Sequence, residues 1–157
     1  MIDASQLRNR VIAPVLDYLG MGGLAAENLL LGTAAVESEM GTWLAQVGGG
    51  PALGIYQMEP RTLHDLRVNW LDFRPDISQL VDVLLYPHDP PEVQLVTNLA
   101  FATAAARCLY RRAREPLPAA SDLPGLAGYW KRHWNTKAGA GSVDRAIEAY
   151  QRCVGAA

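Results

Sequence analysis

The chain has 157 residues, of which 50% are hydrophobic and 19% are charged, and its formal net charge is −2. This length and composition exclude a disordered or fibrous protein and suit a globular chain with a real hydrophobic core. The slightly acidic balance gives no overall electrostatic drive toward DNA or RNA. We therefore expect one domain spanning residues 1–157, with no nucleic-acid partner.

The first half of the chain predicts helices separated by a glycine-rich loop. Apolar residues at helical spacing indicate a helix over residues 7–19, which Pro14 should kink. A second helix is predicted over residues 25–41, where a glycine stops it. Residues 42–56 hold too many glycines for a helix, and they predict an ordered loop or a short β-hairpin. A proline suited to a first helical turn begins the next helix, over residues 60–68.

The second half continues the helical pattern. A short helix is expected over residues 77–85, and an alanine-rich periodicity predicts one long, buried helix over residues 92–115. Two more helices are expected over residues 123–134 and 143–153, the last with Ser142 as its N-cap. The sequence therefore predicts a mainly α fold.

Several features bear on location and partners. Residues 1–10 lack the uninterrupted apolar core of a signal peptide, and no apolar stretch approaches the ~20 residues that a membrane helix needs. We expect synthesis in the cytoplasm without membrane insertion. One cluster of basic residues is typical of a solvated helix face, with a nucleic-acid-binding patch as the alternative. The cluster consists of Arg107, Arg111, Arg112, Arg114, Lys131 and Arg132.

The sequence gives no pattern for a metal or cofactor. The two cysteines are too few for a disulfide framework, and two buried reduced thiols are the expected state. The three histidines lie far apart, without cysteine or carboxylate partners at ligand spacing. We expect neither a metal site nor an organic cofactor.

The chemistry of the chain is predicted around Glu37 and Ser38, which end a helix, and residues 52–60, which follow the glycine-rich loop. A carboxyl group at a helix end, facing a loop that lets backbone approach a ligand, suits the wall of a cleft. In an apolar wall its pKa rises, so near neutral pH it keeps a proton to donate to a glycosidic oxygen. The alternative is an ordinary surface glutamate. The expected apolar neighbours are Val36, Met40 and Tyr56.

At these residues the sequence resembles the lytic transglycosylase family of the lysozyme-like superfamily. The family signature is Glu-Ser, a loop, then Gly-Leu-Met-Gln and a proline shortly after. Here the matching residues are Glu37-Ser38, then Gly54-Ile55-Tyr56-Gln57, then Pro60. Residues 98–110 look like the third helix of the family, and Trp134-Asn135-Thr136 with Gly139 stands where the family carries Tyr-Asn-x-Gly. The similar stretches cover about residues 25–150 in the same order.

The resemblance implies a goose-type lysozyme-like helical domain with a short loop or β-hairpin after the catalytic helix. It implies that Glu37 is the single catalytic acid and base in cleavage of the MurNAc–GlcNAc bond of peptidoglycan. Ser38 would hold that carboxylate or the neighbouring backbone in place. The residues expected to line the substrate site are Ser38, Gly54, Tyr56, Gln57, Trp134 and Asn135.

The chain departs from the family pattern in two places that matter for the chemistry. Tyr56 replaces the usual methionine, and a loop tyrosine is expected to stack on sugar or to hydrogen-bond with it. Trp134 replaces the tyrosine whose hydroxyl approaches the glutamate, which leaves Tyr129, Tyr150 or Tyr56 to supply a phenolic donor.

The short chain also resembles phage-borne versions of the family. The expected partners are therefore peptidoglycan strands and other virion proteins, with action at the cell wall after virion delivery or after release by a holin. Hydrolysis would need a second carboxylate, for which Glu39, Glu59 and Asp65 are the nearest candidates. The rival hypothesis is a degenerate domain that serves as a structural or tail component of a phage particle and cleaves nothing.

Overall fold

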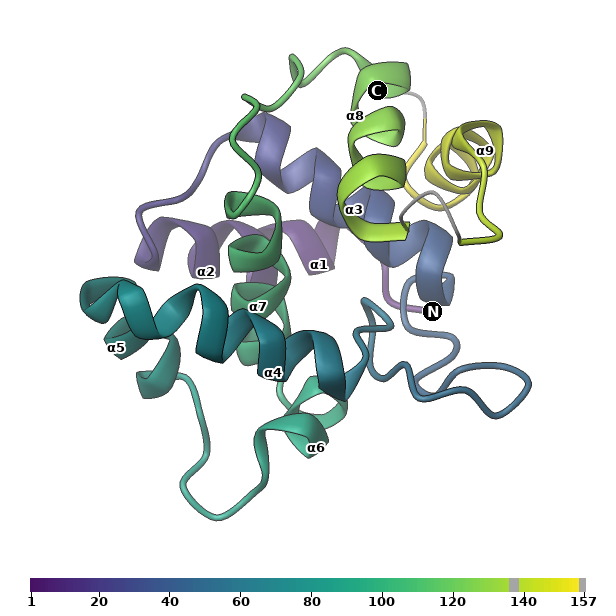
Figure 1. Ribbon diagram of the computed structural model, residues 1–157. Helices are drawn as coiled ribbons and strands as arrows, with labels where there is room; N and C mark the ends of the chain where they lie inside the picture. Colours follow the sequence, from purple (N-terminus) through teal and green to yellow (C-terminus); the bar gives the residue numbers. More distant parts are fainter. Residues whose placement is uncertain (136–138, 156–157) are drawn as a thin grey trace.

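The computed structural model of the protein describes residues 1–135 and 139–155. Within these residues the fold is mainly helical and holds no β-strand, which confirms the predicted mainly α class. Figure 1 shows α3 in the upper half of the molecule beside α8 and α9, with α4, α5 and α6 below. The elements are α1 (Ala4–Leu7), η1 (Arg8–Ile12), α2 (Ala13–Tyr18), α3 (Leu24–Ser38), α4 (Pro60–Asn69), η2 (Leu71–Phe73), α5 (Pro75–Val83), α6 (Pro91–Thr97), α7 (Leu99–Arg111), α8 (Leu123–Trp130), η3 (Lys131–Asn135) and α9 (Val143–Cys153).

The N-terminal helix begins earlier than its apolar pattern, because Asp3 caps α1 by accepting a hydrogen bond from the Gln6 amide. Its middle part, η1, has π-helical hydrogen bonding and ends just before Pro14. A proline ring clashes with the carbonyl four residues back and lacks an amide hydrogen. The predicted irregularity at Pro14 is therefore present as a change of helix type.

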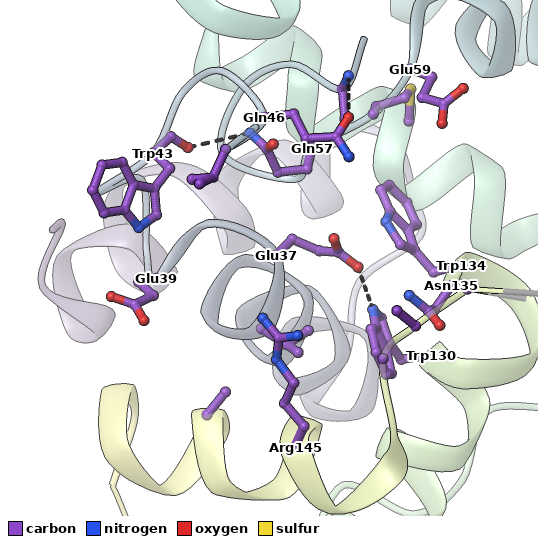
Figure 2. A pocket seen from close by; sticks show the side chains of 18 of the residues that line it. Glu37, Glu39, Trp43, Gln46, Gln57, Glu59, Trp130, Trp134, Asn135 and Arg145 are labelled. Atoms are coloured by element: carbon purple, nitrogen blue, oxygen red, sulfur yellow. Dashed lines mark hydrogen bonds between the residues drawn. The ribbon is translucent and has the colours of Figure 1, made fainter. Parts of the chain in front are cut away.

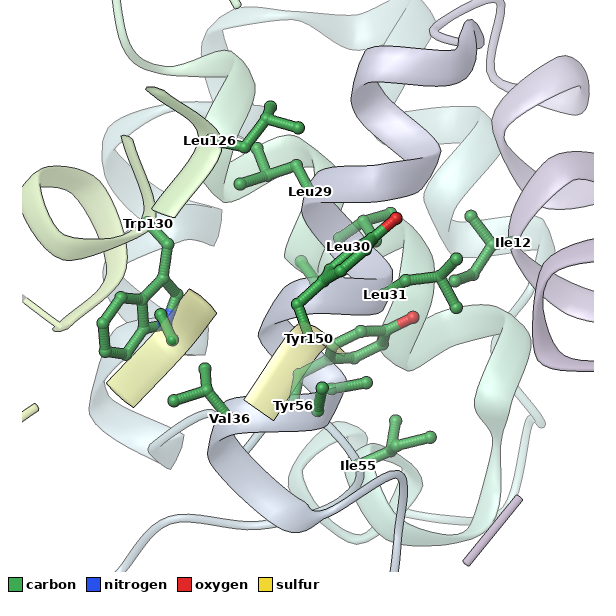
Figure 3. Close-up of a cluster of buried hydrophobic side chains, with 14 of the residues drawn as sticks. Ile12, Leu29, Leu30, Leu31, Val36, Ile55, Tyr56, Leu126, Trp130 and Tyr150 are labelled. Atoms are coloured by element: carbon green, nitrogen blue, oxygen red, sulfur yellow. The ribbon is translucent and has the colours of Figure 1, made fainter. Parts of the chain in front are cut away.

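α3 is buried on most of its surface and contributes many residues to one of the two core clusters. It packs against α8 and α9, and Figure 3 shows side chains from α3, α8 and α9 meeting in one core cluster. At its end Glu39 and Met40 take positive φ angles of 50° and 56°. This left-handed turn stops the helix and sends the chain into the loop of residues 41–59.

That loop is ordered without forming a hairpin. Isolated β-bridges join Leu53 to Ala45 on one side and to Met58 on the other, in place of paired strands. The sequence left a loop and a short hairpin as alternatives, and the structure contains the loop.

The long helix predicted over residues 92–115 is wrong, because Asn98 divides it into α6 and α7. Asn98 takes an extended conformation, and its side-chain oxygen accepts a hydrogen bond from the Phe101 amide as the N-cap of α7. Its amide nitrogen donates to the carbonyl of Leu84. Asparagine favours such caps, but the apolar periodicity continues on both sides of the break and hides it.

The C-terminal part follows the predictions closely. α8 passes directly into the π-helical segment η3, and Ser142 caps α9 by accepting from the Arg145 amide, as expected. Thr136, part of the sequence pattern that resembles Tyr-Asn-x-Gly, lies outside the described residues. Among the helices that the structure describes, none is long and apolar enough to cross a membrane.

Candidate functional site

A cleft of about 890 Å³ lies at the C-terminal end of α3. One wall is the loop of residues 41–59, and the opposite wall is formed by α9 together with the end of α8 and η3. Figure 2 shows Glu37 reaching into this space from α3, with Gln57 on one side and Trp130 on the other. The cleft therefore joins residues between 36 and 62 to residues between 109 and 152.

Glu37 is half-buried and is held by a single hydrogen bond among the described residues. The indole Nε1–H of Trp130 donates to Oε1 of Glu37 at 2.9 Å. Burial raises the pKa of Glu37 to about 7, and the Trp130 hydrogen bond and the positive charge of Arg145 oppose that rise. This confirms the raised pKa that the sequence predicted, and it means that much of the population keeps the proton near neutral pH.

The expected phenolic donors to Glu37 do not supply that hydrogen bond. Tyr129 donates to the carbonyl of Glu115 instead, and the hydroxyl of Tyr56 bonds with Thr103. Trp130 lies in the core with 3% of its surface exposed, and the sequence did not identify it as a donor to Glu37. The available signal was the spacing of Trp130 and Trp134, which places both rings on one helical face.

The prediction that Ser38 contacts substrate is wrong, because its side chain is fully buried. Its hydroxyl donates to the carbonyl of Ile55 and accepts from the amide of Gly41 at 2.9 Å. Ser38 therefore fastens the following loop to the end of α3. This is the backbone-holding role that the family resemblance implied, without a contact to the Glu37 carboxylate.

Gly54 also lies outside the cleft, contrary to prediction. Its φ is +74°, and a Cβ at this position would lie 1.8 Å from the carbonyl oxygen of Leu95 in α6. Its amide is already used by the carbonyl of Leu44. The glycine is required for close packing of the loop on α6, so its backbone is not free to bind a sugar.

Tyr56 is likewise not a sugar contact, since only 2% of its surface is exposed. The ring enters the core beside α3, and its hydroxyl lies 3.1 Å from the hydroxyl of Thr103 on α7. The buried Tyr56 therefore anchors the loop to the core. Met40, another expected neighbour of Glu37, is also fully buried, whereas Val36 lines the cleft.

The remaining predicted site residues, Gln57, Trp134 and Asn135, all line the cleft. Gln57 has a positive φ of 49°, and its side-chain nitrogen donates to the carbonyls of Gly54 at 2.8 Å and Trp43 at 3.3 Å. These bonds fix the amide group on the loop wall.

On the opposite wall, η3 holds its two cleft residues firmly. Trp134 packs against the ring of Tyr110 with centroids 5.2 Å apart. The side-chain oxygen of Asn135 accepts from the ammonium of Lys131 at 2.6 Å. Trp43, on the loop, adds a third indole to the cleft and is 50% exposed.

Other charged groups stand around the cleft. Glu39 lies 3.5 Å from Arg152, and Glu59 pairs with Arg61. Asp65, the other candidate second carboxylate, faces a separate hollow where it pairs with Arg112 at 2.6 Å. No group of three or more histidine, cysteine or acidic residues in the described ranges is arranged to hold a metal ion.

Comparisons with protein-family models, with curated proteins and with solved structures found no match to this chain. Its function is therefore inferred from the residues of the cleft and from the sequence pattern around Glu37.

Proposed function

We propose that the protein is a peptidoglycan lytic transglycosylase with a lysozyme-like helical fold, in which Glu37 acts first as acid and then as base. The observation that carries the proposal is the placement of Glu37: a half-buried carboxyl group, with a pKa of about 7, at the base of an open cleft. A carboxyl group in such surroundings has the proton that glycosidic bond cleavage requires.

The proposed reaction needs one carboxyl group. Glu37 donates its proton to the glycosidic oxygen, and the bond between this oxygen and the anomeric carbon of MurNAc breaks. The C6 hydroxyl of the same sugar then attacks the anomeric carbon, and its proton passes to the Glu37 carboxylate. The products are a new GlcNAc hydroxyl end and a 1,6-anhydro end, and the enzyme regains its starting proton.

Hydrolysis would make a further demand on the carboxylates of the cleft. An inverting hydrolase needs a second free carboxylate to activate water across the sugar ring. Glu39 and Glu59, on the cleft wall, are each paired with an arginine.

The cleft also has the composition of a carbohydrate site. Indole rings stand on both walls, at Trp43 and Trp134, and the amide groups of Gln57 and Asn135 line the same cleft. Flat rings suit the C–H faces of sugars, and amides suit their hydroxyl groups. These residues are proposed to bind the glycan strand on either side of the bond that is cut.

Digestion of purified sacculi tests the proposal, with mass analysis of the released fragments. Wild type should release fragments with 1,6-anhydro ends, Glu37→Gln should release none, and Glu92→Gln, which makes the same change on exposed α6, should match wild type. Fragments with reducing ends would instead mean muramidase hydrolysis. Sacculi left intact by the wild type would favour the structural role in a phage particle.

A further inference from the structure

The hydrogen bond from Trp130 distinguishes the two carboxyl oxygens of Glu37. It reaches Oε1, whereas Oε2 makes no hydrogen bond with any residue that the structure describes. Figure 2 shows the second oxygen on the side of the cleft that holds Gln57. The two oxygens of this carboxyl group are therefore not equivalent.

An indole N–H only donates a hydrogen bond, so its partner must present a lone pair. In a protonated carboxyl group the carbonyl oxygen is the good acceptor and the hydroxyl oxygen is a poor one. A donor fixed on Oε1 therefore keeps Oε1 as the carbonyl oxygen and leaves the proton on Oε2. A tyrosine hydroxyl would not impose this choice, because it both donates and accepts.

We propose that Trp130 is a positioning residue that fixes Oε1 of Glu37 as an acceptor, so that Oε2 is the atom that gives and takes the proton. This role rests on the proposed transglycosylase function for its chemical meaning. The orientation of the carboxyl group itself can be measured without any activity.

The indole is held rigidly enough to impose this choice. Trp130 is the last residue of α8, and its ring is almost fully buried in the core cluster around α3. At Gly141 an added Cβ would lie 2.6 Å from the outer edge of the ring, so the backbone leading into α9 packs directly against it. A donor that is fixed before the reaction costs no reorganisation during it.

Other charged groups also lie near Glu37, and variants at Trp130 do not change them. Arg145 on α9 favours the ionised form. The cleft is also lined by Glu39 at the end of α3, by Glu59 before α4 and by Glu148 and Arg152 on α9, while α7, α8 and η3 contribute only uncharged side chains. Variants at Trp130 leave all of these groups in place, so a change in titration does not come from a change in these charges.

The first test is a ¹³C NMR titration of the Glu37 carboxyl in the whole chain. Trp130→Phe should raise the pKa of Glu37 by about one unit, because the variant loses a hydrogen bond that stabilises the carboxylate. Gly141→Ala should raise it less, because it displaces the ring and keeps the N–H. Trp70→Phe, in the second core cluster, makes the same chemical change away from the cleft and should leave the pKa unchanged.

The second test is infrared spectroscopy below the pKa, with the Glu37→Gln spectrum subtracted. Trp130→Phe should shift the carbonyl stretch of Glu37 to higher frequency, because a carbonyl oxygen that accepts a hydrogen bond vibrates more slowly. An unchanged stretch would place the N–H on the hydroxyl oxygen and overturn the assignment of the proton to Oε2.

The third test is the rate of sacculus cleavage against pH. Trp130→Phe should lower the maximal rate by about tenfold or more through loss of orientation, and it should move the alkaline limb of the profile to higher pH. An unchanged profile and an unchanged pKa would overturn the positioning role. Failure of the wild type to cleave sacculi would overturn the proposed function instead, and the titration would still decide the hydrogen bond.

Discussion

Glu37→Gln should stabilise the protein at alkaline pH and have little effect at acidic pH. In the folded chain burial raises the pKa of Glu37 from 4.5 to about 7. Between these values the unfolded chain has released the proton while the folded chain still holds it. The unfolding free energy of the wild type therefore falls as pH rises through this window. Glutamine has no titratable proton, so the unfolding free energy of the variant does not show this fall.

The magnitude follows from the size of the pKa change. A rise from 4.5 to about 7 corresponds to about 3 kcal/mol, since each unit is worth about 1.4 kcal/mol. The advantage of Glu37→Gln over wild type should thus grow from under about 1 kcal/mol at pH 5 to about 3 kcal/mol at pH 8. The glutamine carbonyl also remains able to accept the Trp130 hydrogen bond, so the variant removes the charge and keeps the contact.

Urea denaturation followed by circular dichroism at a series of pH values between 5 and 8 measures this difference. Glu39→Gln is the matched control, because it makes the same change two residues further on, where the carboxylate is solvent-exposed. It should show no comparable growth with pH. A stability difference for Glu37→Gln that stays constant across the series would refute the burial argument, and with it the reason for a protonated acid near neutral pH.

Two further substitutions probe the loop that forms one wall of the cleft. Gly54→Ala should destabilise the fold by about 3 kcal/mol or more in urea denaturation, because it combines a positive φ with a collision against the carbonyl of Leu95. Full stability of the variant would mean that the loop does not pack against Leu95. Trp43→Ala should change stability by less than about 1 kcal/mol, because the ring is half exposed, yet weaken binding of glycan fragments about fivefold in calorimetry. Unchanged affinity would remove Trp43 from the proposed sugar site.

The sequence alone determined the features that depend on neighbours along the chain. Helical periodicity and end signals predicted the mainly α class, and a capping serine marked the start of α9. Glu37 was recognised at a helix end followed by a glycine-rich loop. Gln57 and Trp134, which line the cleft, were expected there only from the resemblance to the lytic transglycosylase family. The helix and cap predictions work because helix formation and capping are governed by contacts between residues a few positions apart.

Only the tertiary structure decided which side chains of the loop face the cleft and which enter the core. Tyr56 and Gln57 are adjacent, yet the first is buried against α7 and the second lines the cleft. The donor to Glu37 comes from Trp130, 93 residues further along the chain. Such contacts arise when α3, α8 and α9 pack together, and they join residues that lie far apart along the chain.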